Sequence, residues 1–281
     1  MLIDTHAHVN FRSFKDDAMD VLRRSLDEGM QVINVGSQID TSRQAVGLAN
    51  KFNKGVYAVV GLHPEHTHSQ HVDEEETHFL TREENFDVVE YRSLCQDPKV
   101  VGIGECGLDY YRLPEDTDPR AVKEKQKAAF IKQINLAAEL DKTLVVHSRP
   151  SKGTDDAALD ILDILKGLKI KDLGLRFVLH SFTGSPEMMQ EFYKLGGYIS
   201  FNGIITFDKT GNMEQLVKSA PLDRIVIETD CPYLAPVPMR GKRNEPLYVE
   251  YVAEKVAELR GLGLAEVERL TTDNAKQLFR I

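Results

Sequence analysis

Residues 2–8 read "LIDTHAH", a short apolar run that ends in two histidines one residue apart, His6 and His8. Side chains two apart lie on the same face of a strand, so the two imidazoles are expected to point to one side. A lone His-x-His pair is more often part of a core or a surface than of a metal site. Its meaning therefore depends on what the rest of the chain places beside it.

Seven more short apolar runs follow the first, separated by amphipathic segments with helical periodicity. The strand-like runs lie at 2–8, 32–35, 56–62, 100–105, 144–147, 175–180, 198–201 and 225–228. The helical segments lie at 16–28, 41–52, 87–96, 120–140, 155–168, 186–195, 212–220, 245–260 and 264–279. Alternating strands and helices predict a parallel sheet, and eight such units predict an α/β fold, the (β/α)8 TIM barrel. A doubly wound open sheet is the alternative.

Six of the eight strand-like runs end at, or within two residues of, a histidine or a carboxylate. These residues are His6, His8, His63, Glu105, His147, His180 and Asp230. A TIM barrel brings the C-terminal ends of all its strands to one face, where catalytic side chains lie. The pattern therefore favours the barrel over the open sheet and predicts one cluster of polar groups on that face.

Alternation along the strands predicts which apolar residues accompany these polar ends. Val101 and Ile103 share the predicted face of Glu105, and Val145 shares that of His147. We expect the apolar members to fill the barrel interior and the polar members to lie at its rim.

Length and charge set further bounds on the protein. The 281 residues are expected to form a single TIM-barrel domain, 1–281, with an inserted loop at about 64–85. No run is apolar enough to cross a membrane, and no signal-peptide pattern is present, so we expect a cytoplasmic protein. The net charge of −9 argues against nucleic-acid binding over the whole surface. Any phosphate group must therefore be held by a local site.

The donor types at the strand ends indicate a site for two metal ions. Imidazole with carboxylate suits Zn²⁺, Mn²⁺ or Fe²⁺ and suits Mg²⁺ less well. Four histidines and two carboxylates are too many for one tetrahedral ion. His6 and His8 could hold one ion with Asp230, and His147 and His180 could hold the other, with Glu105 as the bridge. We expect two divalent ions per chain, with Zn, Mn or Mg as the candidates.

Eight motifs resemble, in order, those of the TatD family of metal-dependent deoxyribonucleases, which are amidohydrolase-like TIM barrels. The motifs are "DTHAH", "GLHPEH", "GIGECGLDYY", "LVVHSR", "LHSFTGS", "YISFNGIITF", "IVIETDCPYLAP" and "PMRGKRNEP". The resemblance extends over nearly the whole chain, including "TTDNAKQLF" in the final helix. It implies metal ligands at His6, His8, Glu105, His147, His180 and Asp230. It also implies that Asp230 is the catalytic base that takes a proton from metal-bound water.

Three other residues of these motifs are candidates for substrate binding. His63 could donate to a phosphate oxygen, although it could also be a structural residue before Pro64. Arg149 has the planar fork that binds phosphate in a bidentate manner, but it could instead pair with an acid. Tyr110 could cap the pocket. Asp4 could orient a metal-binding histidine or could be merely a polar strand residue.

Two charged segments have open interpretations. The cations of "RGKRN" at 240–244 could hold phosphate beside the last strand, or they could belong to a solvated turn. The His-rich stretch after Pro64 could form a third metal site, but a solvated lid over the barrel mouth fits its length and composition better.

These features predict a metal-dependent hydrolase, a phosphodiesterase or deoxyribonuclease of 3′-5′ exonuclease type, whose partner is DNA or another phosphodiester. The first alternative is hydrolysis of an amide, ester or lactone, for example by an aminoacyl-tRNA deacylase, or of another small substrate. The second is a non-catalytic metal-binding protein, for which a missing ligand or base is expected, and none is missing. Neither a membrane nor a protein partner is indicated.

Overall fold

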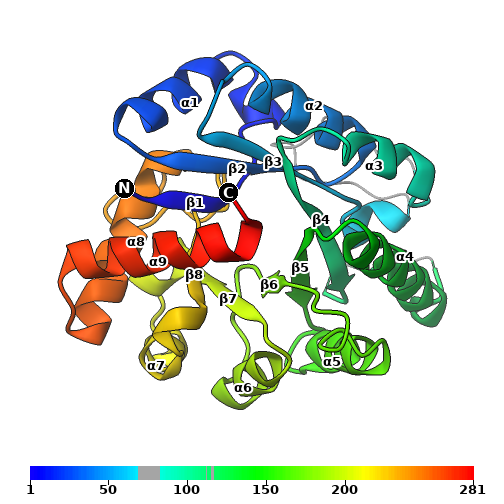
Figure 1. The fold of residues 1–281 in the computed structure, drawn as a ribbon. Coiled ribbons are helices and arrows are strands. Elements are labelled where there is room, and N and C mark those ends of the chain that lie inside the picture. The colour runs from blue at the N-terminus through cyan, green and yellow to red at the C-terminus, as the bar shows by residue number, and fades with distance from the viewer. Residues whose placement is uncertain (69–82, 112, 115–116) are drawn as a thin grey trace.

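Eight parallel strands form a barrel in the computed structural model, which describes residues 1–68, 83–111, 113–114 and 117–281. The strands are β1 (Ile3–Ala7), β2 (Gln31–Val35), β3 (Val56–Val60), β4 (Val100–Asp109), β5 (Thr143–Arg149), β6 (Phe177–Leu179), β7 (Tyr198–Phe201) and β8 (Ile225–Ile227). Each strand pairs with the next one in sequence (Figure 1). A bridge between Ala7 and Cys231 brings β1 beside β8, and the TIM-barrel prediction is confirmed.

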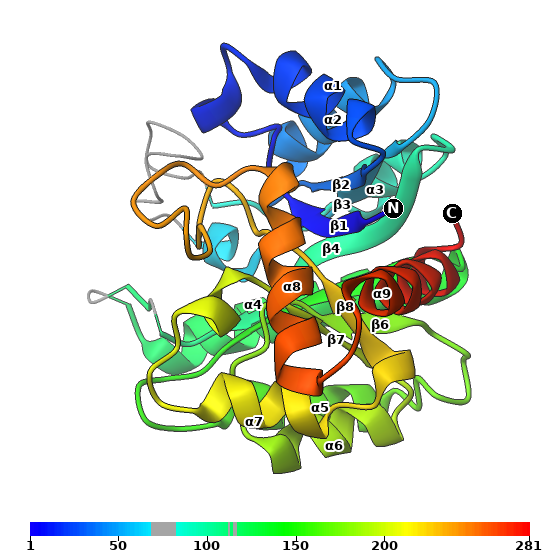
Figure 2. The same ribbon diagram turned by 90° about the vertical axis from the view of Figure 1, so that its left-hand side faces the viewer.

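Helices surround the barrel, and each predicted helical segment overlaps one (Figure 2). The helices are α1 (Ala18–Asp27), α2 (Ile39–Ala49), α3 (Val88–Leu94), α4 (Pro119–Glu139), α5 (Asp156–Gly167), α6 (Pro186–Lys194), α7 (Asn212–Ser219), α8 (Val249–Arg260) and α9 (Leu264–Phe279). Side-chain hydrogen bonds determine where several of these helices begin. The side chains of Asp87, Asp118 and Ser185 accept hydrogen bonds from first-turn amides of α3, α4 and α6. Among the described residues, no helix has the length and apolar character to cross a bilayer.

The barrel interior is filled by apolar side chains from the strands and closed by α9. Val101, Val145 and Val178 belong to this inner cluster, together with Leu278 and Phe279 of α9. In Figure 1 the red helix α9 lies across the barrel, close to both chain termini. Helix α9 therefore fills the end of the barrel opposite the C-terminal ends of the strands.

The predicted position of Ile103 is wrong, because it packs outside the barrel against the helices. Ala58 of β3 pairs with Val100, but the next residue, Val59, pairs with Gly102. The extra residue in β4 is a β-bulge, and it reverses the alternation of faces beyond Val101. An alternation rule applied to an unbroken strand therefore fails at Ile103.

Strands β4 and β5 extend beyond their predicted ends at Glu105 and His147. Their pairing continues to the opposed residues Asp109 and Arg149. Gly107 allows the backbones of β4 and β5 to approach closely there, because a Cβ at this position would lie 2.0 Å from the carbonyl oxygen of His147. The longer ladder brings two additional charged side chains to the mouth of the barrel.

The predicted insertion at 64–85 lies mainly outside the described residues, which omit 69–82. Its first part, Pro64–Thr67, is a short 3-10 helix. His66 and His68 are buried. Within the described part of the chain, neither belongs to a group of three residues able to share a metal ion. Most of the stretch that the lid and third-metal interpretations concern, 69–82, lies outside the described residues.

Candidate metal centre

A cavity of about 420 Å³ opens at the C-terminal ends of the strands. Five of the six predicted metal ligands line it, and the sixth, His6, is buried beside them. We call the six residues the ligand cluster: His6, His8, Glu105, His147, His180 and Asp230. The barrel therefore brings together side chains that lie up to 224 positions apart in the sequence, as expected when strand ends converge.

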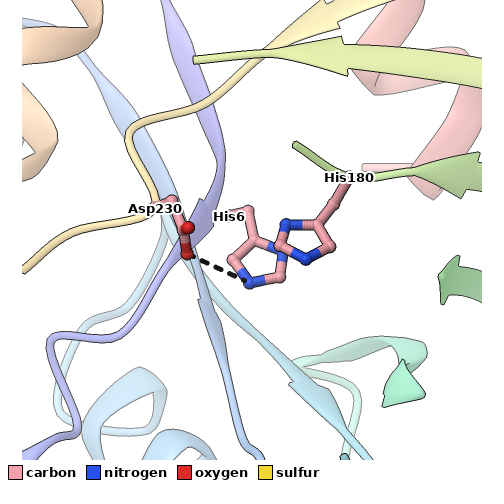
Figure 3. Close-up of side chains that lie close together, drawn as sticks. All are labelled: His6, His180 and Asp230. Atoms are coloured by element: carbon pink, nitrogen blue, oxygen red, sulfur yellow. Dashed lines mark ion pairs between the residues drawn. The ribbon is translucent and has the colours of Figure 1, made fainter. Parts of the chain in front are cut away.

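The first half of the ligand cluster comes from β1 and the segment after β8. The Nε2 atoms of His6 and His8 are 3.1 Å apart. Asp230 Oδ1 lies 3.4 Å from His8 Nε2 and 3.8 Å from His6 Nε2. In Figure 3, Asp230 points to His6, whose ring stacks on that of His180. These donors face a common point from several directions.

Glu105 connects this half of the cluster to the other. Its Oε2 atom lies 3.4 Å from His6 Nε2 and 3.8 Å from His8 Nε2. Its Oε1 atom lies 2.8 Å from His147 Nδ1 and 2.7 Å from His180 Nε2. Because each carboxylate oxygen faces a different histidine pair, Glu105 has the position expected of a bridging ligand.

The hydrogen bond made by His8 shows that its cavity-facing nitrogen suits a cation. Its Nδ1 atom donates to the carbonyl oxygen of Val35, 2.8 Å away, so a neutral ring carries its proton on Nδ1. The lone pair on Nε2 then faces the oxygens of Asp230 and Glu105. Such an arrangement is repulsive unless a proton or a metal ion lies between the groups, and a hydrogen bond from the other ring nitrogen to a backbone carbonyl is typical of metal-binding histidines. The donor set therefore fits a divalent ion.

The two cluster carboxylates are held in their charged form. Burial opposes ionisation of Glu105, but the neighbouring His180, His63 and His147 outweigh it and lower the pKa of this carboxyl well below its usual range. Burial also opposes ionisation of Asp230, whereas the neighbouring imidazoles of His8, His180 and His6 lower its pKa. Both groups are thus available as anionic ligands, or as a proton acceptor, near neutral pH.

Sequence reasoning missed Asp109 and Glu228, which contact the ligand cluster. Asp109 Oδ2 lies 3.1 Å from His147 Nε2, and Glu228 Oε1 lies 3.4 Å from His180 Nδ1. Glu228 also accepts a hydrogen bond from the amide of Ser181. Both residues could have been found from the sequence, because each lies an even number of positions from a predicted ligand of its own strand region. Asp109 was missed because the fourth strand was predicted to end at Glu105.

Two predicted substrate residues, His63 and Arg149, line the cavity. His63 Nδ1 accepts a hydrogen bond from the amide of Glu65, so the proton of a neutral ring lies on Nε2, 3.4 Å from Glu105 Oε1. His63, Glu105 and His147 are close enough to share an ion, but this tautomer makes His63 a hydrogen-bond donor. The guanidinium of Arg149 stacks 4.4 Å from the ring centre of Tyr111.

Tyr110 lies away from the cavity lining. Its ring is buried, and its hydroxyl donates to Asp160 Oδ2 at 2.7 Å. The ammonium group of Lys123 lies 3.9 Å from the ring centre. These contacts give Tyr110 a structural role between α4 and α5, and the tyrosine beside the ligand cluster is instead Tyr233.

Both arginines of the 240–244 segment are engaged in structural contacts. Arg243 forms a double hydrogen bond with Asp17 and stacks on Phe14. Arg240 donates to the carbonyl oxygen of Ala235 and stacks on a phenylalanine ring. Neither arginine lines the cavity, so the solvated-turn interpretation describes this segment better than the phosphate-binding one.

The segment that carries Asp230 is held by two buried side chains, one from an earlier and one from a later part of the chain. Asp4 accepts hydrogen bonds from the amide of Thr229 at 2.9 Å and from the backbone amide, not the ring, of His6 at 3.3 Å. Asn244 donates to the carbonyl oxygens of Thr229 and Tyr233, at 2.9 and 2.6 Å. Asp230 has a φ of +57°, a conformation that a non-glycine residue keeps only when its surroundings enforce it. These bonds provide that enforcement.

An eight-stranded α/β barrel with imidazoles and carboxylates gathered at its strand ends has the architecture of a metal-dependent hydrolase. The model of the family described as "TatD related DNase" matches residues 3–280. The chain belongs to this family and is a metal-dependent hydrolase.

Relatives and solved structures agree with this assignment. The chain is 39% identical over 282 residues to YabD of Bacillus subtilis (strain 168), described as an uncharacterized metal-dependent hydrolase, with 100% of both chains covered. It is 30% identical to the 3′-5′ ssDNA/RNA exonuclease TatD of Shigella flexneri serotype 5b (strain 8401), covering 100% of this chain and 99% of that protein. The crystal structure of YJJV, a TatD homolog from Escherichia coli k12, matches with a TM-score of 0.79 at 27% identity, covering 100% of this chain and 98% of that one.

Proposed function

We propose that the protein is a phosphodiesterase that removes nucleotides from the 3′ end of DNA, with two divalent ions held by the ligand cluster. The observation that carries this proposal is the position of Arg149 and His63. Both groups can bind phosphate oxygens, and both line the cavity that the ligands occupy. The description of the Shigella flexneri relative as a 3′-5′ ssDNA/RNA exonuclease supports a nucleic-acid substrate.

The ligands divide into two pairs around a shared carboxylate. His6 and His8 form one pair and His147 and His180 the other, with Glu105 between them and Asp230 beside the first pair. Divalent ions bound there supply Lewis acidity that activates water and stabilises charge on a phosphate. Zn²⁺, Mn²⁺ and Mg²⁺ are the ions to be tested.

Asp230 is the proposed general base. Its carboxylate lines the cavity, carries negative charge, and is held in place by the hydrogen bonds around Thr229 and Tyr233. It accepts the proton of the water that attacks phosphorus. A positioned base of this kind contributes a factor of about 10²–10⁴ to the rate.

Arg149 and His63 hold the phosphate and oppose the charge that develops on its oxygens. The guanidinium offers two parallel donors, and its stacking on Tyr111 limits its movement. His63 offers the Nε2–H group that now faces Glu105. Donors that are already in place in a partly enclosed cavity stabilise a developing charge more than water does.

The size of the cavity favours an exonuclease. Its volume of about 420 Å³ lies in the ~300–1,000 Å³ range of sites that hold one small ligand. Such a cavity accepts the end of a strand, whereas the interior of a duplex is too wide to bring its phosphates to the ligand cluster.

Replacement of Arg149 tests the proposal. We expect Arg149→Ala to lower kcat/KM on single-stranded DNA by about 10²–10³, with partial recovery in Arg149→Lys, because a charged donor aimed at the phosphate is lost. Hydrolysis of an uncharged carboxylic ester should change little. Arg43→Ala, which removes an exposed arginine of α2 far from the cavity, is the matched control.

Two results would contradict the proposal. One is unchanged DNA cleavage by Arg149→Ala. The other is a metal-loaded enzyme that hydrolyses esters or aminoacyl-tRNA but no nucleic acid, which would establish the amide or ester hydrolase instead.

A further inference from the structure

We propose that one side of the cavity is a binding site for the base of a single nucleotide. The site consists of Phe11, Ile204, Tyr233 and Leu234, which we call the apolar arc. This inference rests on the proposed phosphodiesterase function and adds the part of the substrate that is recognised besides the phosphate.

The apolar arc is continuous because its residues follow neighbouring strands. Ile204 follows β7, Tyr233 and Leu234 follow β8, and Phe11 follows β1. Strand β7 pairs with β8, and the bridge between Ala7 and Cys231 places β8 next to β1. Side chains that are far apart in the sequence therefore form one wall of the cavity.

The opposite wall is polar and comes from the other strands. His63 and Glu65 follow β3, Asp109 and Arg149 end β4 and β5, and Ser181 follows β6. The ligand cluster lies between the two walls. A substrate that spans the cavity therefore meets an arginine and a histidine on one side and an apolar surface on the other.

The apolar arc has both a rigid base and accessible surface. Phe11 is 4% exposed and stacks on His8 with ring centres 4.2 Å apart, so it forms the base of the wall. Ile204, Tyr233 and Leu234 are half-buried and present side-chain surface to the cavity. Their chemistry calls for an apolar or flat partner, since a polar group would lose water there without gaining a bond.

Hydrogen bonds hold the backbone of the apolar arc in place. Asn244 donates to the carbonyl oxygen of Tyr233 at 2.6 Å, and Asn202 accepts from the amide of Ile204 at 3.1 Å. Both asparagines are buried. A wall fixed in this way is preorganised for a ligand and loses little conformational freedom when it binds.

A nucleobase fits this wall better than an acyl chain does. Every base has two flat faces that stack on an aromatic ring such as Tyr233, and this stacking depends little on base identity. The phosphate of the same nucleotide can then reach the ligand cluster and Arg149. A cavity of about 420 Å³ is suited to one such unit.

Equilibrium binding to the metal-loaded, full-length protein tests the site. Isothermal titration calorimetry would compare 5′-dTMP with 2-deoxyribose 5-phosphate, which carries a hydroxyl group at C1 in place of the base. We expect dTMP to bind at least about fivefold more tightly, because one stacked base contributes at least that factor. We expect Tyr233→Ser to bring the ratio of the two dissociation constants close to one and Tyr233→Phe to restore it. Tyr251→Ser, on α8 outside the cavity lining, is the matched control and should keep the ratio.

Each other outcome has a defined meaning. Equal affinities for the two compounds in the wild-type protein would overturn the base site while leaving phosphodiester hydrolysis intact. Absence of binding by both compounds and by inorganic phosphate, in an enzyme that hydrolyses esters, would overturn the proposed function itself. If Tyr233→Ser does not fold, as judged by circular dichroism, Ile204→Ala provides the test, and an unchanged ratio in that variant would overturn the site.

Discussion

Glu105 is the residue on which both halves of the ligand cluster depend. One of its oxygens faces His6 and His8, and the other faces His147 and His180. A single side chain with two chemically equal oxygens is thus shared by four imidazoles. An amide cannot replace it, because one of its two ends is a donor.

Glu105→Gln should therefore remove the bridge while keeping the shape of the side chain. We expect the purified variant, reconstituted with Zn²⁺ or Mn²⁺, to hold fewer ions per chain than the wild type when measured by inductively coupled plasma mass spectrometry. The physical reason is the loss of both the negative charge and one ligand oxygen. Retention of the wild-type metal content by Glu105→Gln would contradict the bridging role.

At the level of residues, the candidate site could be predicted where chemistry and strand position coincided. His147 and Glu105 were found because each closes an apolar run. Asp109 was missed because the apolar character of the fourth run fades before the hydrogen-bonded ladder ends. Tyr110 was given a substrate role from its neighbours in the motif, but sequence proximity does not reveal that its ring points towards Asp160.

The segment after β8 is an element whose position depends on tertiary hydrogen bonds. It has no regular ladder beyond Ile227, and Asp230 follows in a left-handed conformation. Asn244, from a later part of the chain, satisfies two of the carbonyl groups of this segment. The position of Asp230, the proposed base, therefore depends on a residue that belongs neither to the cavity lining nor to the ligand cluster.

Asn244→Ala should lower activity through the position of Asp230. We expect kcat on DNA to fall by at least about tenfold and stability to fall by about 1–3 kcal/mol, because two buried carbonyl groups lose their donor. The matched control is Asn274→Ala. Its amide binds the carbonyl oxygens of Leu222 and Ile225 at the other end of β8.

The two asparagine variants separate stability from positioning. Both should show similar losses of stability in urea unfolding, but Asn274→Ala should keep its kcat because it lies far from the cavity. Equal kcat values in the two variants would show that Asn244 has only a structural role.

The start of α5 depends on the carboxylate of Asp156. It accepts hydrogen bonds from Lys123, Thr154 and the amide and hydroxyl of Ser151. Partial burial disfavours the charged form, but the bonds from Lys123 and Ser151 outweigh it, and the pKa of Asp156 is lowered. The same bonds fix the loop that follows Arg149.

Asp156→Asn should therefore destabilise the protein in a pH-dependent manner. At pH 7 we expect a loss of about 1 kcal/mol, because charge-assisted hydrogen bonds are stronger than neutral ones. The folded pKa lies below the unfolded value of ~3.9, so this contribution is complete above that pH and is lost as the pH falls towards the folded pKa. Urea unfolding at several pH values measures the difference, which should shrink below pH ~4. A difference that grows on acidification would contradict this role.

The order and type of elements followed from periodicity, whereas their exact ends did not. Apolar runs and helical stripes identify elements because burial imposes those periods on the sequence. The bulge in β4 and the extension of β4 and β5 arise from pairing between strands, which a single run does not display. The segment from 69 to 82 lies outside the described residues, and its predicted role as a lid stays a prediction.

At the scale of the whole molecule, the negative net charge leaves the mouth of the barrel as the place where an anionic substrate would be attracted. The chain carries a net charge of −9, and the two arginines of the 240–244 segment, Arg240 and Arg243, are engaged in structural contacts. Under the proposed function, attraction of a phosphodiester comes from bound cations, with Arg149 and His63, at the mouth of the barrel. The proposal therefore favours a short, flexible strand end over binding along an extended surface.

Digestion of a 5′-labelled single-stranded oligonucleotide by metal-reconstituted enzyme is the decisive assay, because the labelled products show from which end the strand is shortened. We predict stepwise release of mononucleotides from the 3′ end by the wild-type protein. We also predict a loss of at least about 10² in rate for Asp230→Asn, which keeps the size of the side chain but cannot accept the proton. Release of no nucleotide by the wild-type enzyme with Zn²⁺, Mn²⁺ or Mg²⁺ would contradict the proposed exonuclease activity. Cleavage by Asp230→Asn as fast as by the wild type would contradict the role of Asp230 as the base.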